Sequence, residues 1–166
     1  MGQIQQIISK ARSYLGSSGG ETFWRDYGLT YRVPWCMIFV WYVFQACGLS
    51  RLLYDGRKIA YVPTLDTWAR DMQLIVTDPQ PGDLIIYDWN ANDIADHIGI
   101  CTGSTATTIT TIEGNADDTV KELTRQRAQV LRIIRPAYDP EPSQQAGDYV
   151  TRTELRAWLQ ELLTKI

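Results

Sequence analysis

The sequence predicts an α+β domain in which N-terminal helices pack on an antiparallel β-sheet. Two observations favour this fold class. Residues 34–48 form an almost entirely apolar run bounded by proline and glycine, and the residue pattern changes from helical to β after residues 79–83. Helices followed by strands are typical of α+β proteins. The length of 166 residues suits one domain with a sizeable core.

The apolar run at residues 34–48 predicts the central, buried helix. Pro34 suits a helix start because its fixed φ matches the first turn, and Gly48 suits a helix end. An all-round apolar helix is either buried or spans a membrane, and this run is shorter than the ~20 residues that spanning requires. Cys36 therefore lies in the first helical turn, where free N–H groups and the helix dipole favour a thiolate. It is either a nucleophile or a small core side chain.

The segments on either side of this helix are assigned from the same kind of spacing. Apolar residues within 4–15 predict an amphipathic helix, and residues 16–33 predict a loop whose aromatic side chains mostly plug the core. Residues 49–63 look irregular. A short helix is expected over residues 64–72.

The second half of the chain predicts the sheet. Proline and glycine at residues 79–83 are a strong turn signal, and the segments that follow are rich in the β-branched residues typical of strands. We expect strands over residues 84–87, 97–102, 107–113, 120–124 and 130–134, with a turn at Gly114-Asn115.

The end of the chain is set apart by its composition. We expect a domain over residues 1–138, a linker over residues 139–150 and an amphipathic helix over residues 151–166. Three roles are open for this last helix. It docks on the domain, it binds a protein partner, or it begins a further region.

Charge and composition exclude several classes of function. The net charge of −3 argues against a general nucleic-acid binder, and no apolar run suits membrane insertion. Three cysteines do not form a disulfide framework, and a single histidine excludes a His-rich metal site. We expect no cofactor. The N-terminus lacks the basic and apolar regions of a signal peptide, so we expect synthesis in the cytoplasm.

Polar residues in the predicted sheet complete a candidate active site. A thiol hydrolase needs a histidine that takes the proton of the cysteine and a polar group that orients the imidazole. His97 begins a predicted strand, and Glu113 and Asn115, two residues apart, would share a face at the end of the next strand. A lone histidine or glutamate is more often structural. Together with Cys36 they favour catalysis.

Four sequence blocks stand out in chain order: Pro34-Trp35-Cys36, Pro81-Gly82-Asp83-Leu84-Ile85, Asp96-His97-Ile98-Gly99-Ile100 and Ile112-Glu113-Gly114-Asn115. Together they resemble the CHAP domain, a family of cysteine, histidine-dependent amidohydrolases and peptidases. That family is related to papain-like and NlpC/P60 peptidoglycan hydrolases, so the resemblance implies a papain-like, NlpC/P60-like arrangement of the helices and the sheet. It covers roughly residues 1–138. The last block especially is similar to cell-wall amidases of phages and prophages.

The resemblance implies a role for each candidate residue. Cys36 would attack an amide carbonyl, with its backbone N–H as an oxyanion donor, and His97 would accept and return the proton. Glu113 would orient the imidazole, and Asn115 would assist in or near the site. Trp35 would either wall the substrate cleft or only pack.

The implied substrate is bacterial peptidoglycan, cut between sugar and stem peptide or within the peptide, and the enzyme would act on the cell wall. Some family members hold calcium, but Glu21 and Asp26 do not make an oxygen-rich loop, so we expect no required metal. Two alternatives stay open. The same thiol chemistry could act on another amide, as a toxin-type peptidase or deamidase, or the chain could be a non-catalytic phage structural or binding module.

Overall fold

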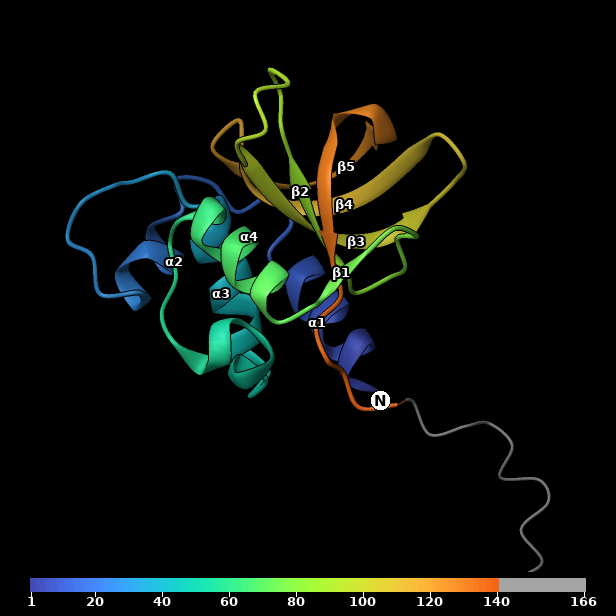
Figure 1. Ribbon diagram of the computed structural model, residues 1–166. Helices are drawn as coiled ribbons and strands as arrows, with labels where there is room; N and C mark the ends of the chain where they lie inside the picture. The colour runs from blue at the N-terminus through green and yellow to red at the C-terminus, as the bar shows by residue number, and fades with distance from the viewer. Residues whose placement is uncertain (141–166) are drawn as a thin grey trace, which may run out of the picture.

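The computed structural model describes residues 1–140, in which helices pack against one face of an antiparallel sheet (Figure 1). The sheet order is β1-β6-β2-β3-β4-β5. The α+β prediction is therefore confirmed. The helices are α1 (Gln3–Arg12), α2 (Glu21–Asp26), α3 (Cys36–Ala46) and α4 (Val62–Asp71), with 3₁₀ turns η1 (Ser50–Leu52), η2 (Tyr54–Gly56) and η3 (Arg127–Gln129). The strands are β1 (Ile75–Val76), β2 (Leu84–Tyr87), β3 (His97–Ser104), β4 (Thr108–Ala116), β5 (Thr119–Gln126) and β6 (Val130–Ile134).

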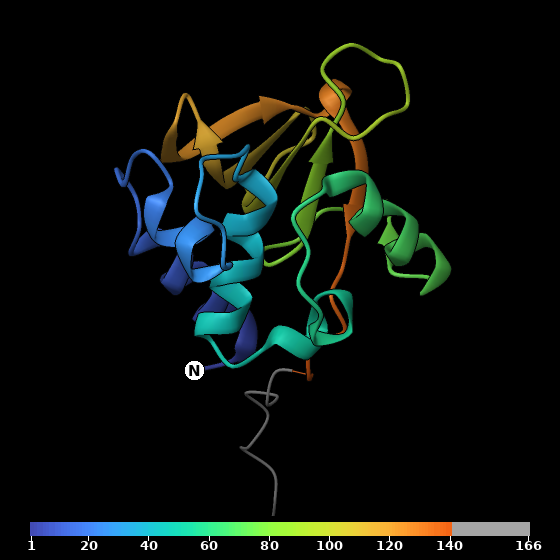
Figure 2. The same ribbon diagram turned by 90° about the vertical axis from the view of Figure 1, so that its left-hand side faces the viewer.

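Helix α3 is the central helix that the apolar run predicts. Eight of its residues are buried, and it packs against β3 and β4 on one side and α1 and α2 on the other. In Figure 2, α1 and α2 (blue) lie on one side of α3 and α4 (green) on the other. Burial of a side chain such as Phe39 contributes about 1.5–3 kcal/mol. Gly48, with φ of 70°, follows the helix end, as predicted.

Local differences from the predicted elements have simple causes. The segment 16–33, predicted as a loop, contains the six-residue helix α2, which is too short to show helical periodicity in the sequence. Phe23 and Trp24 on α2 are buried, so most of the aromatic plug is confirmed, whereas Tyr31 is exposed. The two-residue strand β1 was not predicted, because it is defined only by its pairing with β6.

The Gly114-Asn115 turn is a wrong prediction, because both residues lie inside β4. The chain turns instead at Asp117 and Asp118, whose φ values are 48° and 58°. Glycine is required at position 114 for a different reason. A Cβ atom there would lie 2.4 Å from Cβ of Phe39, so β4 passes directly against α3.

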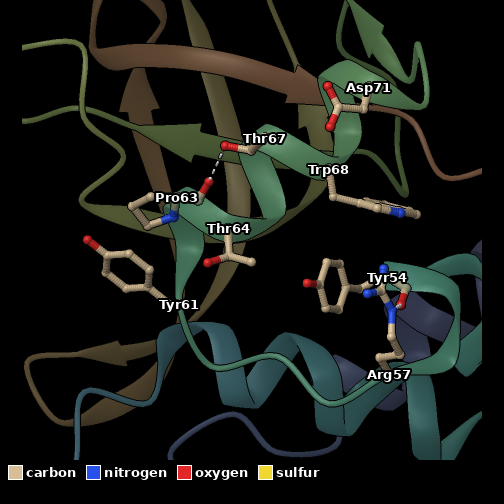
Figure 3. A pocket seen from close by; sticks show the side chains of 8 residues that line it. All are labelled: Tyr54, Arg57, Tyr61, Pro63, Thr64, Thr67, Trp68 and Asp71. Carbon is tan, nitrogen blue, oxygen red and sulfur yellow. Dashed lines mark hydrogen bonds between the residues drawn. The ribbon is translucent and has the colours of Figure 1, made fainter.

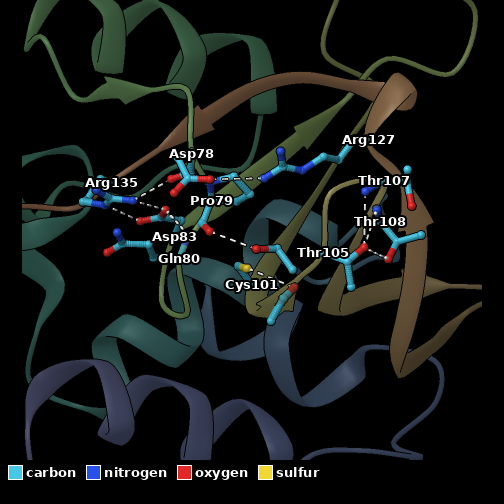
Figure 4. A network of polar contacts seen from close by, with 12 residues as sticks. Asp78, Pro79, Gln80, Asp83, Cys101, Thr105, Thr107, Thr108, Arg127 and Arg135 are labelled. Carbon is cyan, nitrogen blue, oxygen red and sulfur yellow. Dashed lines mark hydrogen bonds and ion pairs between the residues drawn. The ribbon is translucent and has the colours of Figure 1, made fainter.

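The predicted turn at residues 79–83 is fastened to the end of β6 by a polar network (Figure 4). Arg135 donates from Nε to Oδ1 of Asp83 (2.9 Å) and from Nη2 to Oδ2 (2.8 Å), and Asp83 is only 1% exposed. Arg135 also donates to the backbone carbonyl of Asp78 (2.9 Å). The side-chain carboxylate of Asp78 forms an ion pair with Arg127 (3.4 Å). This fork ties the start of β2 to the end of β6.

Tyr138 ties the end of the predicted domain to α3 and to the turn at residues 79–83. Tyr138 donates its hydroxyl to the carbonyl of Gly82 (2.8 Å) and stacks near Phe44 of α3. The helix predicted over residues 151–166 and most of the linker predicted over residues 139–150 lie outside the described residues. Within residues 1–140, none of the helices has both the length and the apolar character that crossing a bilayer requires.

Candidate active site

Cys36 is the first residue of α3, where sequence reasoning placed it. Trp35 precedes it as the N-cap without a side-chain cap, and the first turn of α3 contains no acidic residue. The first N–H groups of the helix therefore remain available, with the positive end of the helix dipole unopposed. Cys36 is 7% exposed, which leaves it a small surface open to a substrate.

His97 is the first residue of β3 and pairs across the sheet with Tyr87 of β2. Its Nε2 atom lies 2.9 Å from Oε2 of Glu113. This contact occupies Nε2 and leaves Nδ1 as the ring nitrogen available to the Cys36 thiol. His97 is 8% exposed, so the imidazole exchanges little with bulk water.

Glu113 is fully buried, and four donor atoms surround its carboxylate. Oε1 accepts from Nε of Arg125 (3.0 Å) and from the hydroxyl of Thr111 (2.7 Å). Oε2 accepts from Nη2 of Arg125 (2.7 Å) and meets Nε2 of His97 (2.9 Å). Because an ionised carboxylate can only accept, the Nε2 atom of His97 must carry a hydrogen.

The electrostatics of the pair favour a charged imidazole and a charged carboxylate. Burial alone would raise the pKa of Glu113, but hydrogen bonds from His97 and Arg125 outweigh it and lower the pKa to about 2. Burial likewise lowers the pKa of His97, whereas hydrogen bonds with Cys36 and Glu113 and their negative charges raise it to about 9. At neutral pH, His97 therefore carries a positive charge on the side that faces Cys36.

Three of the predicted site residues thus converge from α3, β3 and β4, although they are distant in the sequence. Trp35 does not join them at an open surface. It is fully buried, its ring stacks on Phe23 with centroids 5.3 Å apart, and Nε1 donates to Asp118 (3.3 Å). Of the two roles left open for Trp35, the structure shows packing. The predicted substrate contact is corrected accordingly.

Asn115 also departs from the expected geometry. Its φ is 60°, and the register between β4 and β5 shifts between Glu113 and Ala116. The strict alternation that would place Asn115 on the face of Glu113 is therefore broken. Within residues 1–140, no side-chain hydrogen bond of Asn115 links it to His97 or Glu113.

Sequence reasoning missed several residues around the carboxylate. Arg125 and Thr111 bind Glu113 directly. Trp89 is 42% exposed, and its ring lies 5.8 Å from the imidazole of His97 and 5.0 Å from the guanidinium carbon of Arg125. No signal in the sequence marks Arg125; in the structure it belongs to the less exposed face of β5, which it shares with Lys121 and Leu123.

Metal ligation finds no support in the described part of the chain. Across residues 1–140, no three His, Cys, Asp or Glu side chains are grouped as a metal site would require. Glu21 is paired with Arg25 on the surface of α2. The carboxylates considered for calcium, Glu21 and Asp26, therefore do not form a ring of oxygen ligands.

A separate hollow of about 510 Å³ lies between η2 and α4 (Figure 3). Its wall carries the aromatic rings of Tyr54, Tyr61 and Trp68, and the guanidinium of Arg57 lies over the ring of Tyr54 at 3.9 Å. None of the residues that line it belongs to the group around Cys36, so the hollow is distinct from the candidate reaction centre.

Comparison with known protein families agrees with this geometry. The sequence model of the CHAP domain matches residues 26–115, which is more than half of the chain. The matched range begins within α2, contains Cys36 and His97, and extends through Glu113 to Asn115. No curated protein matches the chain.

Proposed function

The chain belongs to the CHAP domain family of cysteine, histidine-dependent amidohydrolases and peptidases, and on this premise we propose that it hydrolyses an amide bond of bacterial peptidoglycan through a thioester on Cys36. The observation that carries the proposal is the convergence of three side chains. Glu113 holds the His97 imidazole at 2.9 Å, and Cys36 is close enough to the same imidazole to raise its pKa. This is the arrangement of nucleophile, base and orienting group that acyl transfer requires.

The first half of the reaction forms the acyl-enzyme. The Cys36 thiolate attacks the carbonyl carbon of the amide, and the carbonyl oxygen becomes an oxyanion. The free N–H groups of the first turn of α3 lie beside the sulfur and can donate to this oxyanion. When the C–N bond breaks, the His97 imidazolium gives its proton to the leaving amine, and a thioester remains on Cys36.

The second half returns the enzyme to its resting state. Neutral His97 takes a proton from water, and the resulting hydroxide attacks the thioester carbonyl. Collapse of the second oxyanion breaks the C–S bond, releases a carboxylic acid that then ionises in solvent, and restores the thiolate beside the imidazolium. Throughout, Glu113 keeps the hydrogen on Nε2, so that Nδ1 exchanges the catalytic proton.

Incubation with purified peptidoglycan tests the proposal. The wild-type protein should release soluble fragments, whereas Cys36→Ala and His97→Ala should each lower the rate by about 10³-fold or more. Circular dichroism should show unchanged folding. Cys47→Ala is the matched control, because its half-buried thiol contacts the carbonyl of Gln6 and lies outside the site. Full activity of Cys36→Ala would refute the mechanism.

Mass spectrometry of the fragments identifies the bond. A new amino group on the alanine next to muramic acid would assign an amidase, and a new amino group elsewhere in the peptide an endopeptidase. The phage endolysin-like role suggested by the Ile112–Asn115 block is part of the same proposal, and it predicts lysis of intact bacterial cells with exposed walls. Absence of any new amino group would instead favour a substrate other than the wall.

A further inference from the structure

We propose that Arg125 is a positioning residue of this active site: it locks the buried Glu113 carboxylate in one orientation and offsets its charge, so that Glu113 orients His97 without taking its proton. The inference rests on the proposed function for its effect on turnover. Its structural basis is the set of contacts that surrounds Glu113, a residue with no exposed surface.

The guanidinium of Arg125 binds both carboxylate oxygens at once. Nε lies 3.0 Å from Oε1 and Nη2 lies 2.7 Å from Oε2 of Glu113. Two parallel bonds from a planar fork fix the plane of the carboxylate, which a single bond cannot do. The Oε2 atom is thereby held where it meets Nε2 of His97 at 2.9 Å. The orientation of the imidazole therefore depends on the fork.

Charge balance gives Arg125 its second role. A buried carboxylate without a counter-ion is costly. Without Arg125, the positive charge of protonated His97 would be the only charge that balances Glu113. Arg125 supplies a permanent positive charge to the same two oxygens. His97 thus faces a carboxylate that is already paired, and it can release its proton to a leaving amine more readily.

The position of Arg125 is itself fixed by neighbouring aromatic side chains. The indole of Trp89 lies 5.0 Å from the guanidinium carbon and stacks on the ring of Tyr87 at 4.9 Å. The Tyr87 hydroxyl contacts the Thr111 hydroxyl (2.9 Å), which donates to Glu113. Because Thr111 gives its only hydrogen to the carboxylate, it must accept from Tyr87. Trp89 and Tyr87 therefore support the two residues that bind Glu113.

The strand register shows that this arginine is used in preference to a nearer cation. Glu113 of β4 lies directly opposite Lys121 of β5, whereas Arg125 lies opposite Ile109. The Lys121 ammonium binds Asp117 instead (2.7 Å). An ammonium is a point charge and cannot bind two oxygens in a planar fork, so the more distant arginine suits the carboxylate better.

The same sheet provides a matched control in the Arg135–Asp83 fork, seen in Figure 4. Its two distances, 2.9 and 2.8 Å, resemble those of Arg125, and its carboxylate is similarly buried. It lies at the other end of β2 from the residue that pairs with His97. Arg135→Gln therefore removes an equivalent structural bond without touching the active site.

His97 is the only histidine in the chain, so NMR titration of its imidazole is unambiguous and needs no substrate. In folded Arg125→Gln, the pKa of His97 should shift by about one unit or more. The shift is upward where Glu113 keeps its contact and only the positive charge is lost, and downward where the carboxylate leaves His97. Arg125→Lys keeps the charge and should leave the pKa nearly unchanged, but it should lower kcat at least tenfold at constant KM. Arg135→Gln should change neither quantity.

Two results would overturn the proposal: an unchanged His97 titration in folded Arg125→Gln, or the same shift in Arg135→Gln. If Arg125→Gln does not fold, Arg125→Lys decides, because wild-type turnover in that variant rules out the positioning role. The titration remains informative if peptidoglycan is not the substrate. Failure of the proposed function and failure of this inference are thus distinguishable.

Discussion

Gly99→Ala should inactivate the enzyme although residue 99 carries no reacting group. Gly99 lies in β3 two residues after His97 and pairs with Ile85. A Cβ atom on Gly99 would lie 2.8 Å from Cγ of Glu113 and 2.8 Å from Cβ of Thr111. Because Gly99 has no side chain, the Glu113 side chain can pass over β3 and reach His97.

The size of the effect follows from these distances. Carbon atoms prefer separations of about 3.5–4.0 Å, so a contact at 2.8 Å forces a displacement of roughly 0.7–1.2 Å. Overpacking of this kind costs about 1–3 kcal/mol of stability. A shift of about 1 Å in Glu113 also breaks its 2.9 Å contact with His97, and misplacement by that amount costs on the order of 100-fold in rate.

Gly103→Ala in the same strand is the matched control, because a Cβ atom there meets no atom within 4 Å. We expect Gly103→Ala to stay within about 0.5 kcal/mol of the wild type and to retain its turnover. Gly99→Ala should lose stability in urea unfolding and turnover on peptidoglycan, and the pKa of His97 should fall from about 9 toward its ordinary value. Wild-type turnover with an unchanged His97 titration in Gly99→Ala would refute the reasoning.

Three further predictions concern protons and donors at the site. Turnover should decline as the pH rises through about 9, because His97 then loses the proton that the leaving amine needs; a pH–rate profile that stays flat to pH 10 would contradict this. The raised pKa of His97 also contributes stability that is complete below its unfolded value of about 6.5 and is lost as the pH rises through about 9, measurable by urea unfolding. Glu113→Gln should lower both turnover and stability, the latter by about 1–3 kcal/mol, because its amide NH₂ would face an N–H of Arg125 in either orientation. An unfolding midpoint equal to that of the wild type would show that the carboxylate is dispensable.

The parts of the fold that could be predicted are those with local signals. Helix α3 is predicted because its boundaries are marked by Pro34 and Gly48 and its interior is apolar throughout. The position of Cys36 at its first residue follows directly. Most strands are predicted because β-branched residues cluster between turn signals, as in β3 and β4.

The parts that could not be predicted depend on contacts between strands. Nothing near Arg125 in the sequence indicates that its side chain reaches Glu113, because the contact depends on the register of β4 and β5. The same limit explains the aromatic residues. Trp35 was favoured because it adjoins Cys36, yet the exposed indole beside the imidazole belongs to Trp89, eight residues before His97.

Charge and space together explain why these residues occur as a set. A neutral amide could orient His97 without a counter-ion, but a buried carboxylate such as Glu113 needs one, and Arg125 supplies it. The carboxylate also needs a path across β3, and Gly99 leaves that path open. With the counter-charge of Arg125 and the space at Gly99 both present, the His97 imidazolium lies between Cys36 and a carboxylate that is already paired. The enzyme therefore starts each cycle with its charges already in place, and loss of either support should disturb the imidazole rather than the sulfur.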